Sequence, residues 1–245
     1  TKKILYKIDN FDNIITVTQN IKSNTIVPIF FLSNVTGTGI DSLKNFINLL
    51  PPRCTYNNID SHVEFIIDDH FQVTGCGTIV SGLLTAGTVK INDEIYIGPS
   101  LNNNNFIKTH IKSIHYNKVP VDKISSGHYI CLCLKKISRK EIYKGMVILS
   151  SNEHTKVYKK FRADVHILKS HHTSIRINYQ PLLHINNIRQ SAKIIEISDK
   201  DILRTGDRSS VIFEFICRPA YIKCGDKIIF REGKVRGMGI ITKLL

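Results

Sequence analysis

The sequence has 245 residues, of which 42% are apolar, and its 34 basic and 20 acidic residues give a formal net charge of +14. A chain of this length can bury one large core or two small ones. The positive charge favours an anionic partner, most commonly RNA or DNA. No apolar run approaches the roughly 18 residues that span a bilayer, and no basic amphipathic helix is evident, so we expect no membrane partner.

The chain opens with TKKILYKIDN, which has neither a Met nor a signal-peptide pattern and predicts a segment of a longer protein. No CxxC spacing occurs, so the cysteines do not suggest a zinc site. We expect them to be buried free thiols in a reducing cytoplasm, with Cys131 and Cys133 on one face of a strand. The six are Cys54, Cys76, Cys131, Cys133, Cys217 and Cys224.

Residues 26–53 follow a strand, loop and helix pattern. The apolar run 26–32 is typical of a buried parallel strand, and apolar residues then recur at helical spacing from Ile40 to Leu50, where two prolines stop the helix. This pattern predicts one βα unit of an α/β domain, to which residues 4–17 add a strand or two. The polar residues 53–61 predict a linker.

Beyond the linker, short β-favouring runs alternate with turn residues such as Asn92-Asp93 and Gly206-Asp207. A dozen short strands over this length favour two small closed β-barrels over one sandwich. The polar stretch 150–155 is the expected boundary between them. The runs are 63–67, 78–82, 94–98, 111–115, 129–134, 146–150, 161–168, 182–186, 192–197, 210–216, 227–230 and 239–245.

Residues 64–92, EFIIDDHFQVTGCGTIVSGLLTAGTVKIN, carry a specific pattern. The arrangement D-x-F-x-V-x-G-x-G-T-x-V-x-G, followed by G-x-x-K, resembles the opening of the second domain of elongation factor Tu and its relatives. Four glycines in it allow bends and close backbone approach. They are Gly75, Gly77, Gly82 and Gly87. Eight or more matched positions at fixed spacing make the resemblance specific.

Two further regions agree with this resemblance. The loop SNVTG at 33–37 is similar to the fifth nucleotide-binding motif of these GTPases, which backs the guanine base, and implies partial nucleotide contacts from Ser33, Asn34 and Val35. LRTGD at 203–207 and FREG at 230–233 resemble the third domain of the same family. Together with NNIRQSAKI, these sequences most resemble the subgroup of GTP-binding proteins one and two.

The resemblance covers the whole chain and implies a mainly β fold in three parts. Residues 1–58 would be the α/β remnant of a GTP-binding domain with its linker. Residues 59–152 and 153–245 would be the second and third domains, each a small β-barrel.

The family binds GTP through a P-loop, a D-x-x-G switch and an N-K-x-D motif, none of which occurs in these residues. Without a P-loop nothing cradles the phosphates or places magnesium. We therefore expect no catalytic residue, no metal site and no cofactor in this chain, which should be inactive alone. The resemblance implies that a full-length parent is a GTPase that uses GTP and Mg²⁺.

In relatives that deliver aminoacyl-tRNA, the 3′ end of the tRNA lies against the second domain. An aromatic side chain such as Phe71 can support a terminal base. Two histidines stand where elongation factor Tu has acidic residues, so recognition of the terminal adenosine need not be identical. The alternative is that Phe71 and Val73 are core residues and Asp68-Asp69 a turn. By position, the implied aminoacyl-end pocket comprises Asp68, Asp69, Phe71, Val73, Gly75, His115, His128 and Tyr129.

The third domain supplies the candidate contacts to the RNA backbone. In delivery factors the corresponding face grips the acceptor and T stems through backbone contacts, which suits RNA recognised by shape. An ordinary solvated charge is the simpler interpretation for most basic residues, whereas Arg189 and Arg231 lie within matched motifs. The candidates are Lys169, Arg176, Arg189, Arg231 and Arg236.

The leading hypothesis is a cytoplasmic, monomeric segment of a GTP-dependent translation factor whose barrels bind aminoacyl-tRNA and the ribosome. The alternative is a non-catalytic RNA adaptor that joins transcripts to an RNA-decay machinery. Preference for aminoacylated over uncharged tRNA would separate the two.

Overall fold

The computed structural model describes residues 3–23, 25–51, 61–151, 155–168, 174–232 and 235–245. The chain divides into two compact units, Thr1–Thr55 and Tyr56–Leu245. The linker expected at 53–61 lies, except for its last residue, outside the described residues.

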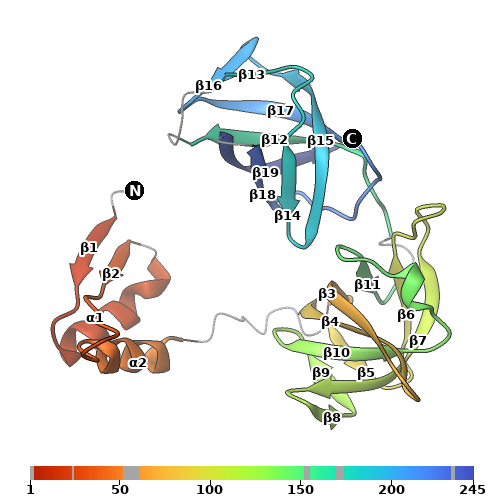
Figure 1. Ribbon diagram of the computed structural model, residues 1–245, viewed down its shortest axis with the longest axis horizontal. Helices are drawn as coiled ribbons and strands as arrows, with labels where there is room; N and C mark the ends of the chain where they lie inside the picture. The colour runs from red at the N-terminus through yellow and green to blue at the C-terminus, as the bar shows by residue number, and fades with distance from the viewer. Residues whose placement is uncertain (1–2, 24, 52–60, 152–154, 169–173, 233–234) are drawn as a thin grey trace. The chain divides into compact units, whose positions relative to one another are not determined.

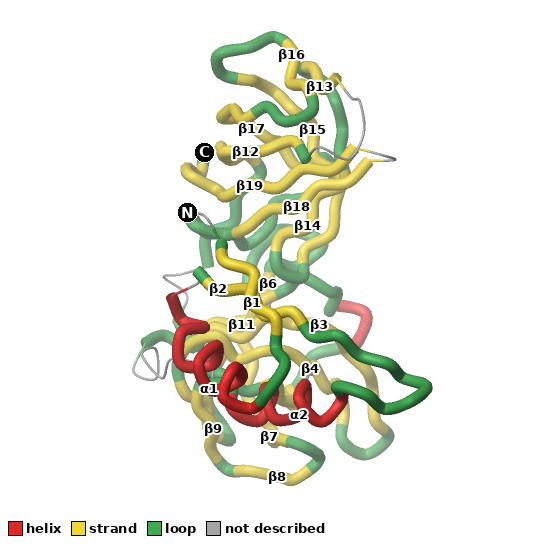
Figure 2. The backbone as a smooth tube through the Cα atoms, turned by 90° about the vertical axis from the view of Figure 1, so that its left-hand side faces the viewer, coloured by secondary structure: helices red, strands yellow, loops and turns green. Residues whose placement is uncertain are grey.

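The first unit is a small α/β assembly in which two parallel strands pair from Ile4 opposite Ile26. Its core consists of Ile8, Ile14, Val17 and Phe46, and the two helices lie side by side in Figure 2. This arrangement agrees with the expected remnant of an α/β domain. The elements are β1 (Ile4–Lys7), α1 (Phe11–Asn20), the 3-10 helix η1 (Ile21–Ser23), β2 (Ile26–Ile29) and α2 (Ile40–Leu49).

Residues 4–17 contribute one strand, the lower of the two expected numbers, and most of a helix that was not expected. The side chain of Asn10 accepts a hydrogen bond from the backbone N–H of Asn13 at 2.9 Å and caps the start of α1. Ile14, Val17 and Thr18 are then buried at helical spacing. The amphipathic period overrides the β preference of these branched side chains.

The barrel of the expected second domain, which we call the second barrel, consists of six strands in the order β10-β4-β3-β11-β6-β7. It is closed because β7 also pairs with β10. β8 extends the sheet beyond β7, and β5 and β9 form a separate ribbon. The strands, shown in Figure 1, are β3 (Glu64–Val73), β4 (Gly77–Ala86), β5 (Thr88–Lys90), β6 (Glu94–Gly98), β7 (Ile107–Tyr116), β8 (Val119–Val121), β9 (Lys123–Ser125), β10 (Tyr129–Leu134) and β11 (Val147–Leu149), with the 3-10 helix η3 (Arg139–Glu141) before β11.

The barrel of the expected third domain, which we call the third barrel, is also closed and has the strand order β12-β17-β15-β14-β18-β19. Its first and last strands pair with each other, with Phe161 opposite Leu244. β13 and β16 form a two-stranded ribbon of their own. The strands are β12 (Lys160–Ile167), β13 (Ser174–Arg176), β14 (Leu182–Ile185), β15 (Ile188–Ile197), β16 (Ile202–Arg204), β17 (Arg208–Phe215), β18 (Lys227–Glu232) and β19 (Val235–Leu244).

Each barrel has its own core of inward-facing side chains. The second barrel buries Phe65, Ile97 and Leu132, and the third encloses Phe161, Phe213 and other fully buried residues. The expected fold class, two small closed β-barrels after an α/β remnant, is confirmed. Within the described residues, no helix combines the length and the apolar character that crossing a bilayer requires.

Candidate functional site

The outward side chains of four adjacent strands in the second barrel form one surface, which we call the Phe71 face. A bulge between Ile67 and Asp69 shifts the pairing of β3 with β4, so that the odd-numbered residues of β3, which are buried before it, are exposed after it. Directly opposed residues of antiparallel strands share a face, so two rows run across β3, β4, β10 and β7. The rows are Asp69-Ser81-Cys131-His115 and Phe71-Ile79-Cys133-Ser113.

The aromatic and apolar residues at the end of β3 are exposed. Phe71 and Val73 are 39% and 38% exposed, whereas Phe65 and Ile67, before the bulge, are fully buried. The alternative that Phe71 and Val73 are core residues is therefore wrong. Tyr129 belongs to the same surface and is 50% exposed.

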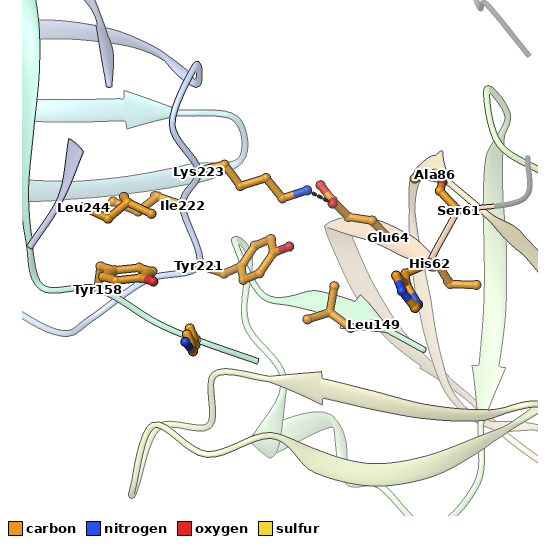
Figure 3. A pocket seen from close by; sticks show the side chains of 12 residues that line it. Ser61, His62, Glu64, Ala86, Leu149, Tyr158, Tyr221, Ile222, Lys223 and Leu244 are labelled. Carbon is orange, nitrogen blue, oxygen red and sulfur yellow. Dashed lines mark hydrogen bonds and ion pairs between the residues drawn. The ribbon is translucent and has the colours of Figure 1, made fainter. Parts of the chain in front are cut away.

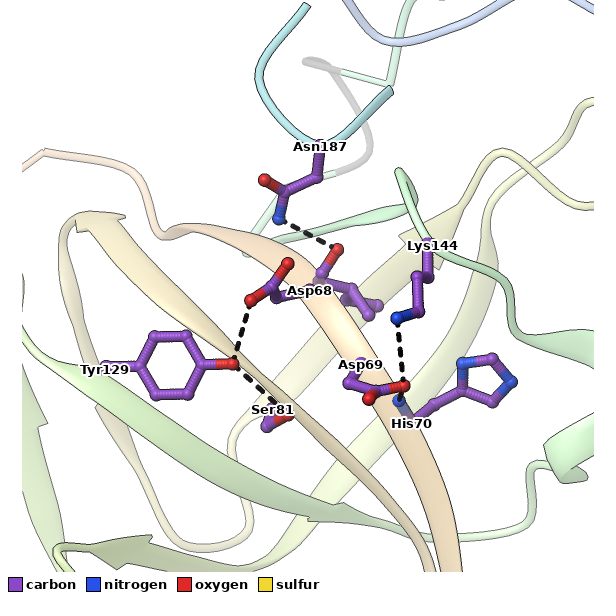
Figure 4. Close-up of polar contacts among 8 residues, drawn as sticks. Asp68, Asp69, His70, Ser81, Tyr129, Lys144 and Asn187 are labelled. Carbon is purple, nitrogen blue, oxygen red and sulfur yellow. Dashed lines mark hydrogen bonds and ion pairs between the residues drawn. The ribbon is translucent and has the colours of Figure 1, made fainter. Parts of the chain in front are cut away.

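Two neighbouring carboxylates, those of Asp68 and Asp69, lie at the bulge near Tyr129, as Figure 4 shows. The Tyr129 hydroxyl lies 3.1 Å from Asp68 Oδ2 and 3.5 Å from Ser81 Oγ. Asp69 Oδ1 accepts the backbone N–H of His70 at 2.9 Å and lies 3.6 Å from Lys144 Nζ. The hydrogen bond from His70 and the charge of Lys144 lower the pKa of Asp69 below its usual value.

The other three candidate pocket residues occupy different places. His115 lies on the Phe71 face, opposite Cys131. Gly75 is in the β3–β4 turn with φ at 81°, a backbone conformation that suits glycine. His128 precedes Tyr129, so alternation directs it away from this face. Its ring meets Tyr116 edge-on at 5.0 Å, and its Nδ1 lies 2.9 Å from the Ser125 carbonyl. His128 is thus separated from the residues that the structure brings together.

The described cysteines are free thiols, but their burial differs from the expectation. Cys131 and Cys133 share the Phe71 face as predicted, and burial raises the pKa of both thiols. Cys76, Cys217 and Cys224 are exposed, so the expectation of burial was wrong for these three. They lie in turns and loops, where no packed strand covers them. Cys54 lies outside the described residues.

Three of the predicted arginines share the outer surface of the third barrel. Arg231 and Arg236 are directly opposed on β18 and β19. Arg189 on β15 pairs with His184 on β14, which in turn pairs with Ile229, two residues before Arg231 on β18. All three arginines are exposed. Like charges directly opposite each other repel, and a bound anion would relieve that repulsion. Arg176 lies instead on the β13–β16 ribbon, and Lys169 is outside the described residues.

The third barrel also has an open hollow of about 920 Å³ that the sequence patterns did not predict. Its floor includes Ile229, Met238 and Ile240, which are 58%, 48% and 49% exposed. His166 and Arg208 also line it. Apolar residues on the outward positions of β18 and β19 were the available signal.

The nucleotide-related loop lies in the first unit, between β2 and α2. Ser33 Oγ accepts the backbone N–H of Thr36 at 3.2 Å, while the Asn34 and Val35 side chains are exposed, Val35 to 96%. This loop could offer contacts to a base, but no described residue provides a phosphate cradle or a magnesium ligand set. The residues present therefore do not fit a complete GTP–Mg²⁺ site. No cluster of metal-ligating side chains occurs among the described residues.

The two barrels meet at a polar junction that sequence patterns did not predict. Lys223 and Glu64 form an ion pair beside a hollow of about 550 Å³, seen in Figure 3. The Arg218 guanidinium lies 3.8 Å from the centre of the Tyr143 ring. Burial raises the pKa of the Tyr143 hydroxyl, which donates to the Pro99 carbonyl at 2.7 Å.

The β14–β15 turn makes a further contact across this junction. Asn187 Nδ2 donates to the Ile67 carbonyl at 3.1 Å, immediately before Asp68. Figure 4 shows this bond beside the two carboxylates.

Comparison with known proteins identifies a domain family and related sequences. Residues 77–149 match the family model of elongation factor Tu domain 2. Over 244 residues, the whole of this chain, it is 41% identical to GTP-binding protein 1 of Xenopus laevis, of which it covers 37%. It is 33% identical over 245 residues to GTP-binding protein 2 of Mus musculus and of Homo sapiens, matching 98% of this chain and 40% of each relative. The chain thus spans less than half the length of these relatives.

Proposed function

Because this chain is an elongation-factor-Tu-like segment related to GTP-binding proteins 1 and 2, we propose that its barrels bind the aminoacylated end and the stem of tRNA. They would do so as part of a GTP-dependent translation factor. The Phe71 face would take the 3′ end, and the outer surface of the third barrel would take the phosphate backbone.

The exposure of Phe71 beside two carboxylates is the observation that carries this proposal. A half-exposed aromatic ring offers a stacking surface for a terminal base. The carboxylates of Asp68 and Asp69 can accept hydrogen bonds from ribose hydroxyls or pair with an α-ammonium group. Asp69, like any ordinary aspartate, is ionised at neutral pH, and its lowered pKa extends the ionised form to more acidic pH. Stacking surface and acceptors together suit the chemistry of an aminoacylated adenosine.

The charge distribution supports a phosphate-binding role for the third barrel. Arg231 and Arg236 are exposed and directly opposed, and Arg189 lies on the same surface. Three guanidinium groups on one face suit phosphates spaced along an RNA stem. The formal net charge of +14 favours the same class of partner.

The remaining parts of the proposal concern the whole protein. We propose that it hydrolyses GTP with Mg²⁺, using motifs outside this chain, and acts on the ribosome as a cytoplasmic monomer. The names of the related GTP-binding proteins support GTP, and the elongation factor Tu relationship supports tRNA and the ribosome as partners. The free thiols among the described residues fit a reducing compartment.

Binding of three short RNAs to this chain tests the proposal. The first is an acceptor-stem hairpin with a single-stranded 3′ end carrying an amide-linked amino acid; the second is the same RNA uncharged, and the third is a blunt hairpin. We expect affinity to fall in that order. Phe71→Ala should weaken binding of the charged RNA by about 5- to 150-fold, from a stacking contribution of about 1–3 kcal/mol. It should leave the blunt hairpin unchanged.

The matched control is Phe31→Ala, which removes another exposed phenylalanine, 68% exposed, from the first unit. It should leave the affinities for all three RNAs unchanged. Equal affinity for charged and uncharged RNA would contradict the delivery function. It would favour instead the RNA adaptor that links transcripts to a decay machinery.

A further inference from the structure

We infer that Asn187 of the third barrel is a positioning residue for the Phe71 face, so that contacts of the third barrel with RNA regulate 3′-end recognition by the second. The inference rests on the proposed function, because it assumes that the Phe71 face binds an aminoacylated end. Its basis is the geometry of the peptide group at the β3 bulge.

The bulge places one peptide group at the centre of the junction. Ile67 pairs with Gly82 and Asp69 with Ser81, so Asp68 is the additional residue. The carbonyl of Ile67 belongs to the planar peptide group that also contains the nitrogen of Asp68. Whatever holds that carbonyl therefore holds the backbone from which the Asp68 side chain projects.

Bonds from two directions hold this peptide group. The Ile67 carbonyl accepts the Gly145 N–H at 3.4 Å, and the N–H of the preceding peptide group, that of Ile67, donates to the Met146 carbonyl at 3.0 Å. Those bonds come from the second barrel itself. Asn187 Nδ2 donates to the same carbonyl at 3.1 Å from the third barrel. A long bond within the barrel is thus supplemented by a shorter one from outside it.

The second carboxylate is connected to the same turn by packing. Asp69 pairs with Lys144, and the next residue, Gly145, has so little room that an added Cβ would lie 3.3 Å from Ile188 Cα and 3.4 Å from the Asn187 carbonyl oxygen. The turn that contains Asn187 therefore abuts the backbone that carries the partner of Asp69. Both carboxylates of the Phe71 face have supports that reach the third barrel.

The β14–β15 turn is short, and a candidate RNA contact lies next to it. Ile185 pairs with Ile188, so Asn186 and Asn187 alone form the turn, with Asn186 at φ 49°. Arg189 follows at the second residue of β15, exposed on the outer surface of the third barrel. A phosphate that binds Arg189 can thus favour the position of the turn in which Asn187 holds the bulge.

The test measures end selectivity, defined as the affinity for the charged acceptor-stem hairpin divided by the affinity for the blunt hairpin. In this chain, Asn187→Ala should lower that ratio by about 2- to 10-fold, the range expected for one neutral hydrogen bond. It should leave affinity for the blunt hairpin within error. Asn187→Asp, which turns the donor into an acceptor facing a carbonyl, should lower the ratio further.

Asn186→Gly is the matched control. It changes the neighbouring residue of the same turn, and glycine adopts its left-handed conformation readily. The end selectivity of this variant should equal that of the unsubstituted chain. Thermal melts followed by circular dichroism should show that all three variants remain folded.

A second comparison separates failure of this inference from failure of the proposed function. If Phe71→Ala lowers the ratio but Asn187→Ala and Asn187→Asp leave it unchanged, the positioning role is refuted and the Phe71 face stands. If Phe71→Ala itself has no effect on the ratio, the proposed function fails. In the double variant with Phe71→Ala, Asn187→Ala should cause little further loss, because the two residues act on the same binding event.

Discussion

Gly145 offers a quantitative test of the junction between the barrels, because another glycine has nearly the same φ but open surroundings. Gly145 has φ at 95° and Gly225 has φ at 93°. A Cβ on Gly145 would meet Ile188 and Asn187 across the junction, whereas no atom lies within 4 Å of a Cβ on Gly225. Substituting alanine at each position therefore separates backbone strain from contact across the junction.

The expected costs follow from these two terms. Alanine at a strongly positive φ loses about 1–2 kcal/mol of folding free energy at either position. At Gly145 the new methyl group must also displace the β14–β15 turn by a few tenths of an ångström, which adds about 1 kcal/mol or more. We expect Gly145→Ala to cost about 2–3 kcal/mol and Gly225→Ala about 1–2 kcal/mol.

Urea denaturation followed by far-ultraviolet circular dichroism measures both values. The chain contains no tryptophan, so the usual fluorescence signal cannot be used. End selectivity should also fall in Gly145→Ala and remain unchanged in Gly225→Ala. Equal destabilisation of the two variants together with equal selectivity would refute the argument, because the contact with the turn would then contribute nothing.

Three further predictions follow from the charges and motifs. The logarithm of tRNA affinity should fall with the logarithm of salt concentration with a slope of roughly −3 to −5, as expected for several phosphate contacts; a flat dependence would exclude them. The pKa of Asp69 is lowered in the folded state, so its contribution to stability is complete above the ordinary carboxyl range and is lost as pH falls through the lowered value. The stability difference between this chain and Asp69→Asn should therefore stay constant above about pH 5 and shrink only in stronger acid, as urea midpoints at several pH values would show. Calorimetry should detect no GTP binding to this chain, and micromolar affinity, about 8 kcal/mol, would contradict our assignment of the missing motifs.

The sequence predicted the barrels well because each run of β-favouring residues is bounded by turn residues. All twelve expected runs overlap strands, whereas the strands it missed are three residues long, such as β5 and β16. So short a segment contains too little alternation to be distinguished from a turn. The helix α1 was missed for a different reason, since its branched residues favour a strand locally and only burial of Ile14 and Val17 favours the helix.

The site was only partly predictable. The motif located Phe71 and the carboxylates on one strand, but their exposure depends on the bulge after Ile67, which a period-two pattern cannot specify. Asn187 is 120 residues from its partner, and nothing in the local sequence indicates a bond over that distance. His128 was grouped with Tyr129 by position in the resemblance, although adjacent residues of an extended segment point to opposite faces.

The pairing of β12 with β19 has a consequence for synthesis of the protein. During translation β12 emerges long before β19, and its edge from Phe161 to Ile167 lacks one partner until the last strand has left the ribosome. An unpaired strand edge is a template for association with other chains. The third barrel therefore cannot close progressively as it is made, and a nascent chain that stalls between β18 and β19 should be retained by chaperones that bind exposed strands.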